Sequence, residues 1–126
     1  MVGFVSACLV ILSSGAVGQT KQRVRFAAGS HGASLPGTVR GYAYRDYLVK
    51  ASAGQKMSLS LTASEPATVM TVFLPNGDNL DGATEADQFR GELPTSGDYV
   101  VRVLMMRSAA RRKGSISNFT LKISIR

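Results

Sequence analysis

The sequence predicts an all-β protein, an antiparallel β-sandwich of about eight short strands in a single domain. Short segments alternate between apolar and polar residues, which is the pattern of a strand with one buried face. Clusters of proline, glycine, asparagine and aspartate separate these segments and favour turns. No segment has a sustained apolar period of about 3.6 residues, as an amphipathic helix would have.

The chain is long enough to fold as one domain with its own core. It has 126 residues, of which 44% are hydrophobic, and domains of this length ordinarily bury enough apolar surface to be stable alone. The composition is that of a globular domain and not of a disordered tail.

The first 18 residues have the pattern of a signal peptide. Residues 4–12 form an apolar run, and Ala16-Val17-Gly18 offers the small side chains that a signal peptidase accepts. The run is too short to span a bilayer, which takes about 20 apolar residues, so we expect no stable membrane insertion. We expect a mature domain over residues 19–126, periplasmic or secreted after cleavage near Gly18-Gln19.

Lipidation at Cys8 is an alternative. Val5-Ser6-Ala7-Cys8 resembles a lipoprotein box, although Cys8 precedes most of the apolar segment that it should follow. It is the only cysteine in the sequence, so a domain beginning near Gln19 has no disulfide and no sulfur ligand for a metal. The stability of that domain then comes from packing alone.

Four strands are expected in the first half of the domain. Three weaker ones are predicted at residues 23–26, 38–42 and 44–49. The clearest is residues 57–62, where apolar residues at odd positions alternate with hydroxyl-bearing residues at even positions.

Four more strands are expected in the second half. Residues 69–74 are apolar on both faces and are predicted to be a central strand, and residues 88–93 form a weaker one. Residues 99–105 are apolar at every odd position and rich in β-branched residues, which favours a strand with one fully buried face. Strict alternation returns over residues 119–126. Turns are predicted between the strands, at residues 36–37, 53–54, 75–78 and 94–98.

The connection formed by residues 106–117 is unusually long. It has twelve residues and lies between the strands predicted at 99–105 and 119–126, whereas hairpin loops usually have two to five residues and longer ones are often functional. Four basic residues and no acidic residue lie in it, and the apolar residues Leu104, Met105 and Met106 precede them. The basic residues are Arg107, Arg111, Arg112 and Lys113. This connection is the strongest candidate site, although a solvated basic face is the ordinary explanation for such a cluster.

The charge of the chain favours acidic partners. Fifteen basic and eight acidic residues, all after Gly18, give a formal net charge of +7, which attracts anionic surfaces and acidic protein clefts. Because the domain is expected to be exported, we expect no nucleic-acid partner.

The residues needed for catalysis or metal binding are not grouped in the sequence. His31 is the only histidine, and no serine motif surrounds it, whereas a serine hydrolase needs a base beside its nucleophile. Residues 76–82 faintly resemble a calcium loop but lack the terminal glutamate that completes one. We therefore expect a protein that is not an enzyme and has no cofactor or bound metal.

Three segments together resemble the periplasmic inhibitors of g-type (goose-type) lysozyme. The similarity runs from about Val24 to Ile125 and includes Gly41-Tyr42-Ala43-Tyr44-Arg45-Asp46-Tyr47 and Ala53-Gly54-Gln55-Lys56. Its most specific part is the pattern S-G-x-Y…R-V-L…R-x-x-A-R. This pattern is formed by Ser96, Gly97, Tyr99, Arg102, Val103, Leu104, Arg107, Ala110 and Arg111.

The resemblance implies a β-sandwich whose long loop enters the acidic substrate groove of the lysozyme. Carried over by position, Arg107 and Arg111 contact the groove, and Tyr47 is a candidate at its rim. Other residues expected at the lysozyme are Arg112, Met106 and Ser108, while Ser96, Gly97, Tyr99 and Arg102 support the loop.

A mechanism follows from this resemblance. A guanidinium placed in the cleft can pair with carboxylates through two hydrogen bonds and occlude the sugar sites. Arg107 is expected to make the central contact because it lies nearest the end of the strand. Arg111 and Arg112 are expected to make rim contacts and to steer association.

A second resemblance leaves another function open. Gly54-Gln55, Pro75-Asn76-Gly77 and residues 96–103 also resemble the small β-sandwich domains appended to secreted peptidases, so only the loop at 107–113 separates the two families. The alternative function is that of a secreted binding module that holds an anionic glycan or envelope polymer through the same basic loop.

Overall fold

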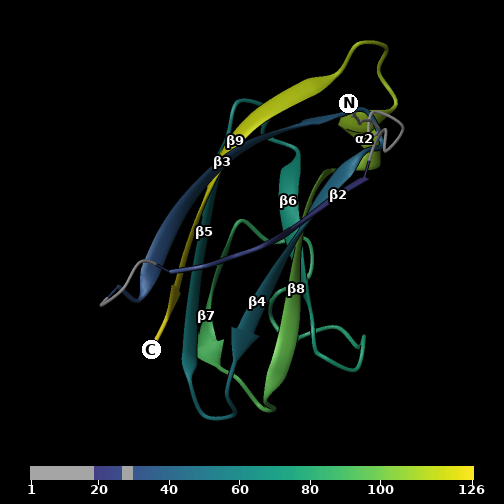
Figure 1. Ribbon diagram of the computed structural model, residues 1–126. Helices are drawn as coiled ribbons and strands as arrows, with labels where there is room; N and C mark the ends of the chain where they lie inside the picture. The colour runs from purple at the N-terminus through teal and green to yellow at the C-terminus, as the bar shows by residue number, and fades with distance from the viewer. Residues whose placement is uncertain (1–18, 27–29) are drawn as a thin grey trace, which may run out of the picture.

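The computed structural model describes residues 19–26 and 30–126, which form two four-stranded sheets packed face to face (Figure 1). The predicted signal peptide and Cys8 lie outside the described residues. The prediction of an all-β sandwich of about eight strands in a single domain is confirmed. None of the helices in the described part is long and apolar enough to cross a membrane.

The first sheet has the strand order β2-β4-β8-β6. Its strands are β2 (Gln19–Arg23), β4 (Tyr44–Ala51), β8 (Gly97–Met105) and β6 (Thr68–Phe73). All neighbours are antiparallel except β2 and β4, which are parallel. Parallel neighbours need a crossover connection, and here the chain crosses to the other sheet between them. The sandwich is therefore antiparallel except at this one edge.

The second sheet has the order β3-β9-β5-β7 and is antiparallel throughout. Its strands are β3 (Gly32–Arg40), β9 (Ile116–Ile125), β5 (Lys56–Ala63) and β7 (Gln88–Glu92).

The core lies between the sheets and is built from alternate residues of each strand. In β8, Val101 and Val103 are fully buried, and in β9 Leu121 is fully buried, while intervening residues face outwards. Met57 begins the same inward series in β5. This is the alternation that the sequence predicted, and burying these side chains supplies the main driving force for folding.

One predicted turn is wrong. Pro36 and Gly37 lie inside β3, which continues to Arg40. A proline is tolerated there because β3 is an edge strand with no neighbour on one side. Gly37 is needed because a Cβ atom would lie 2.6 Å from Cζ of Phe119 and 2.7 Å from a guanidinium nitrogen of Arg45.

Candidate functional site

The basic loop lies at one end of the sandwich, where β8 ends and β9 begins. Residues Arg107–Ala110 form a short helix, α2, which the sequence did not predict. It lies at the upper end of the view in Figure 1, near the start of β6. Strand β9 begins at Ile116, so the connection is shorter than the twelve residues expected.

Contacts on both sides fix the loop to the sandwich. Ala109 and Ala110 are buried in the core, with 2% and 4% of their surfaces exposed. The backbone N–H of Met106 donates a 2.8 Å hydrogen bond to the carbonyl of Ala67. The hydroxyl of Ser115 donates to the carbonyl of Ala110 at 3.2 Å. A loop held in this way loses little conformational freedom when a partner binds.

The helical turn brings two arginines together. Arg107 and Arg111 are four residues apart, and the N–H of Arg111 donates to the carbonyl of Arg107 at 3.0 Å. Residues with this spacing lie one turn apart on the same side of a helix. Because Ala109 and Ala110 face the core, the two guanidinium groups are left towards solvent.

Arg112 already has a partner within the chain. Its Nη2 atom lies 2.8 Å from Oε2 of Glu65, and the other carboxylate oxygen accepts a 3.2 Å hydrogen bond from the N–H of Ala67. The Arg112 side chain is 61% exposed and that of Glu65 is 23% exposed, so solvent screens the pair and it contributes little to global stability. It ties the end of the loop to the turn between β5 and β6.

The other three cations of the loop remain available. Arg107, Arg111 and Lys113 are exposed and form no ion pair with any residue in the described part of the chain. Ser108 is exposed beside Arg107.

Exposed apolar side chains gather around the same helix. Within the described residues, the large hydrophobic side chains that are clearly exposed are Tyr42 (67%), Ile116 (40%) and Met106 (39%). Met106 directly precedes α2, and Ile116 begins β9 after the loop. Tyr42 follows Gly41, whose N–H donates a 3.1 Å hydrogen bond to the carbonyl of Ser115. We call this surface the basic end; it consists of Tyr42, Met106, Arg107, Ser108, Arg111, Lys113 and Ile116.

The prediction that Tyr47 lies at the rim is wrong. Only 1% of its surface is exposed, and its ring packs edge-on against Phe119, with the ring centroids 6.4 Å apart. Its hydroxyl is buried without a hydrogen-bond partner among the described residues. Burial raises the pKa of this hydroxyl, while the nearby Arg45 guanidinium opposes the shift. The exposed tyrosine near the loop is Tyr42. Neither Tyr42 nor Ile116 was predicted from the sequence to be a binding residue.

The first three residues of the S-G-x-Y…R-V-L…R-x-x-A-R pattern lie around the start of β8, at the opposite end of that strand from α2. The hydroxyl of Ser96 accepts a 2.8 Å hydrogen bond from the N–H of Ala53. Gly97 has a φ of 139°, and a Cβ atom there would lie 3.0 Å from the Pro75 ring. Tyr99 is fully buried, and its hydroxyl donates a 2.6 Å hydrogen bond to the carbonyl of Thr95. These residues hold the fold and do not form a binding surface with α2.

Arg102 supports the sheet that carries the loop. Its guanidinium forms two hydrogen bonds with the buried carboxylate of Asp46, at 2.8 and 3.0 Å, and lies 4.0 Å from the centre of the Tyr44 ring. The hydrogen bonds to Asp46 raise the pKa of Arg102. This arrangement joins β8 to β4 on the outer face of the first sheet.

The described residues contain no group of three or more side chains that could hold a metal ion. In the segment that resembles a calcium loop, Asn76 and Asp78 form hydrogen bonds with each other, as in an ordinary polar turn. The basic end, with its exposed cations and apolar side chains, is suited to binding a partner through charge and apolar contact.

Comparison with known proteins identifies the family. No family model matches the sequence. The chain is 29% identical over 111 residues to an inhibitor of g-type lysozyme from Escherichia coli strain K12, covering 82% of this chain and 79% of that protein. The crystal structure of the periplasmic g-type lysozyme inhibitor PliG from Aeromonas hydrophila superposes with a TM-score of 0.74 at 34% identity, covering 86% of this chain and 97% of that one.

The peptidase-appended domains share only the fold. A pre-peptidase C-terminal domain of a collagenase from Bacillus anthracis superposes with a TM-score of 0.54 at 11% identity, covering 84% of this chain and 94% of that one. The alignment with PliG, at 34% identity, covers 97% of that inhibitor. The chain therefore belongs to the family of periplasmic inhibitors of g-type lysozyme.

Proposed function

We propose that this protein inhibits a g-type lysozyme in the periplasm and that the basic end is the surface that enters the lysozyme's substrate groove. It acts by binding and not by catalysis. The observation that carries the proposal is a group of three cations with no ion-pair partner in the described part of the chain, together with three exposed apolar side chains, around one fixed helical turn.

The composition of this surface is that of a protein–protein hot spot. Tyrosine, arginine and methionine are enriched where a few residues supply most of the binding energy. Tyr42 and Met106 can exclude water around Arg107, which strengthens the attraction between its guanidinium and a carboxylate. A glycosidase cleft supplies such carboxylates, because glycoside hydrolysis uses paired acidic groups.

The individual cations have different roles in this proposal. Arg107 makes the central contact because it directly follows Met106 and the end of β8, where the backbone is held. Arg111, one turn on, makes the second contact, and Lys113 steers the approach. Arg112 acts chiefly by holding the loop through Glu65, which differs from the direct rim contact expected from the sequence. Ser108 lies between Arg107 and the buried Ala109 and contributes a polar contact.

The test measures the protein's effect on cell-wall lysis by three lysozymes, of the goose, chicken and invertebrate types. Selective inhibition of the goose type, persisting at 0.15 M salt, is the expected result. Equal protection against all three, seen only at low salt, would contradict the proposal and indicate that the protein coats the anionic substrate through its net charge of +7.

A further inference from the structure

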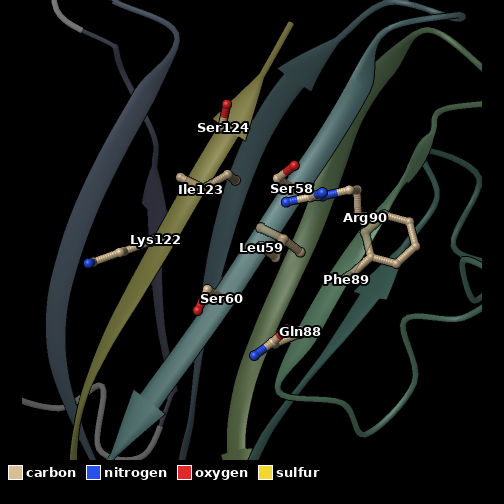
Figure 2. Close-up of a pocket in the computed structure, with 9 residues that line it drawn as sticks. All are labelled: Ser58, Leu59, Ser60, Gln88, Phe89, Arg90, Lys122, Ile123 and Ser124. Atoms are coloured by element: carbon tan, nitrogen blue, oxygen red, sulfur yellow. The ribbon is translucent and has the colours of Figure 1, made fainter.

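An open hollow lies on the outer face of the second sheet, across β7, β5 and β9 (Figure 2). Its volume is about 590 Å³. Leu59 and Ile123 are buried, with 3% and 2% of their surfaces exposed, and turn towards the core. The residues on either side of Leu59, of Ile123 and of Phe89 on β7 line the hollow with hydroxyl, amide and cationic groups: Ser58, Ser60, Gln88, Arg90, Lys122 and Ser124.

Strand register arranges these six side chains in two rows. Ser58 stands between Arg90 on β7 and Ser124 on β9, and in the next row Ser60 stands between Gln88 and Lys122. Figure 2 shows the Arg90 side chain extending from β7 towards Ser58 on β5, whereas the Lys122 side chain extends from β9 in the direction away from β5. The strands that carry the two cations flank β5 and are thus about 10 Å apart, two strand spacings.

The polar side chains of this hollow have no hydrogen-bond or ion-pair partner among residues 19–26 and 30–126. Elsewhere in the sheet, Thr38 donates a 2.8 Å hydrogen bond to Asn118, and other arginines pair with Asp46, Glu65 or Asp98. Within the described residues, none of the six side chains lining the hollow has such a partner. Glu92 lies two residues from Arg90 on the same strand but forms no ion pair with it.

We propose that this hollow binds a carboxylate-bearing oligosaccharide. Serine hydroxyls and the Gln88 amide can both donate to and accept from sugar hydroxyls. Arg90 and Lys122 can pair with carboxylates at either side. Two cations on the strands that flank these neutral polar groups suit a glycan, whose carboxylates stand among many hydroxyl groups.

The hollow shares no residue with the basic end, so the two surfaces can be occupied together. The basic end surrounds α2 at the top of the view in Figure 1, whereas the hollow lies on the broad face formed by β5, β7 and β9. The protein would thereby hold an acidic envelope glycan on one surface while the other surface remains open to a lysozyme. This inference does not depend on the lysozyme being the partner of the basic end.

The test is a titration of the isotope-labelled protein with trigalacturonic acid, followed through backbone amide shifts in NMR spectra, with neutral maltotriose as the comparison ligand. Shifts are expected for residues 58–60, 88–90 and 122–124 with the acidic trisaccharide and not with the neutral one. Shifts confined to residues 107–113, or no shifts at millimolar ligand, would overturn the proposal.

A matched pair of variants separates a site from diffuse attraction. Arg90→Gln with Lys122→Gln is expected to weaken trigalacturonate binding roughly tenfold or more, because two charge-assisted contacts are lost. Lys21→Gln with Arg25→Gln removes the same charge from exposed positions elsewhere and should leave the affinity within about twofold. Equal weakening in both variants would contradict a specific site, and amide spectra of the free variants check that both remain folded.

Discussion

At the scale of single residues, the basic end has one position where charge, apolar contact and rigidity coincide. Arg107 directly follows the exposed Met106, and the N–H of Met106 is held by the carbonyl of Ala67. Lys113 is also exposed but lies beyond the last residue of α2. A cation on a fixed backbone loses less freedom on binding, so equal charges at the two positions are not equivalent.

Replacing Arg107 with alanine should weaken inhibition substantially. The loss of a central, desolvated arginine ordinarily costs about 2 kcal/mol or more, which corresponds to roughly thirtyfold in Kd. Lys113→Ala should instead slow association and reduce its salt dependence. Association and dissociation rates measured by surface plasmon resonance on an immobilised g-type lysozyme distinguish these effects. An Arg107→Ala protein with wild-type dissociation would refute the central role.

Tyr42 should contribute binding energy without contributing to folding. Its side chain is 67% exposed, so Tyr42→Ala is expected to leave the melting temperature within about 2 °C. The same change should weaken binding by roughly tenfold, because an aromatic side chain beside the arginines is removed. Tyr42→Phe keeps the ring and serves as the control. A similar loss in both variants would assign the effect to the hydroxyl and contradict the proposed apolar contact.

Tyr47 gives a contrasting prediction about stability. Burial raises the folded-state pKa of its hydroxyl above the ordinary 10.0. The neutral hydroxyl is therefore favoured in the folded state, and the resulting contribution to the free energy of unfolding is fully present below about pH 10. It is lost as the pH rises towards the folded-state pKa. Tyr47→Phe removes this ionisation and a buried hydroxyl without a hydrogen bond, so it should be neutral or stabilising by up to about 1 kcal/mol at neutral pH. Urea unfolding between about pH 8 and pH 11 measures both effects. A strongly destabilised variant at neutral pH would indicate that the hydroxyl makes a favourable contact with Arg45.

The two tyrosines mark the limit of the sequence pattern. Alternation establishes which residues of a strand share a face, but it does not say which face turns inwards when both carry large side chains. In β4, Tyr47 and Val49 face the core while Tyr44 lies against Arg102 outside. Tyr42 is exposed because Gly41, with a φ of 55°, turns the chain after β3. Neither outcome can be read from the spacing alone.

At the scale of elements, α2 explains why the two key arginines have their spacing. Its single turn buries Ala109 and Ala110 and leaves Arg107 and Arg111 on one exposed side. Four residues are too few for a periodic apolar pattern, so no sequence argument predicted a helix. The position and charge of the loop were predictable, whereas its fixed shape depends on contacts with distant segments, including Ala67 and Glu65.

The ion pair between Arg112 and Glu65 should act on loop geometry and not on global stability. Glu65→Gln is expected to lower the melting temperature by no more than about 2 °C, since solvent reaches the Arg112 side of the pair and screens it. It should speed amide hydrogen exchange in residues 107–113 and speed dissociation from the lysozyme. The exchanged pair Glu65→Arg with Arg112→Glu should restore slower exchange. If exchange is unchanged in Glu65→Gln, the pair does not hold the loop.

At the scale of the whole molecule, strand content and order followed from local patterns, while sheet membership did not. Seven of the eight predicted strands overlap the observed strands β3 to β9. The strand predicted at residues 23–26 is wrong, because β2 is Gln19–Arg23 and residues 24–26 lie outside it. Pro36-Gly37, predicted as a turn, lies within β3 because an edge strand accepts a proline. The parallel pairing of β2 with β4 depends on the path of the chain between the sheets. That path is set by the packing of two whole layers, which no local period encodes.

Net charge is also a property of the whole molecule, and it offers a competing explanation of binding. A charge of +7 attracts any acidic partner through long-range fields. Arg107 and Arg111 account for only two of the fifteen basic residues. If the net charge alone drove binding, removing two cations from any exposed place would have the same effect.

The most direct test therefore compares Arg107→Ala with Arg111→Ala against Lys21→Ala with Arg25→Ala, two double variants of equal net charge. The measurement is the Kd for a g-type lysozyme by isothermal titration calorimetry at 0.15 M salt. If the basic end is the binding surface, we expect the affinity to fall at least a hundredfold in the first variant and less than threefold in the second. Equal losses in the two variants would contradict it.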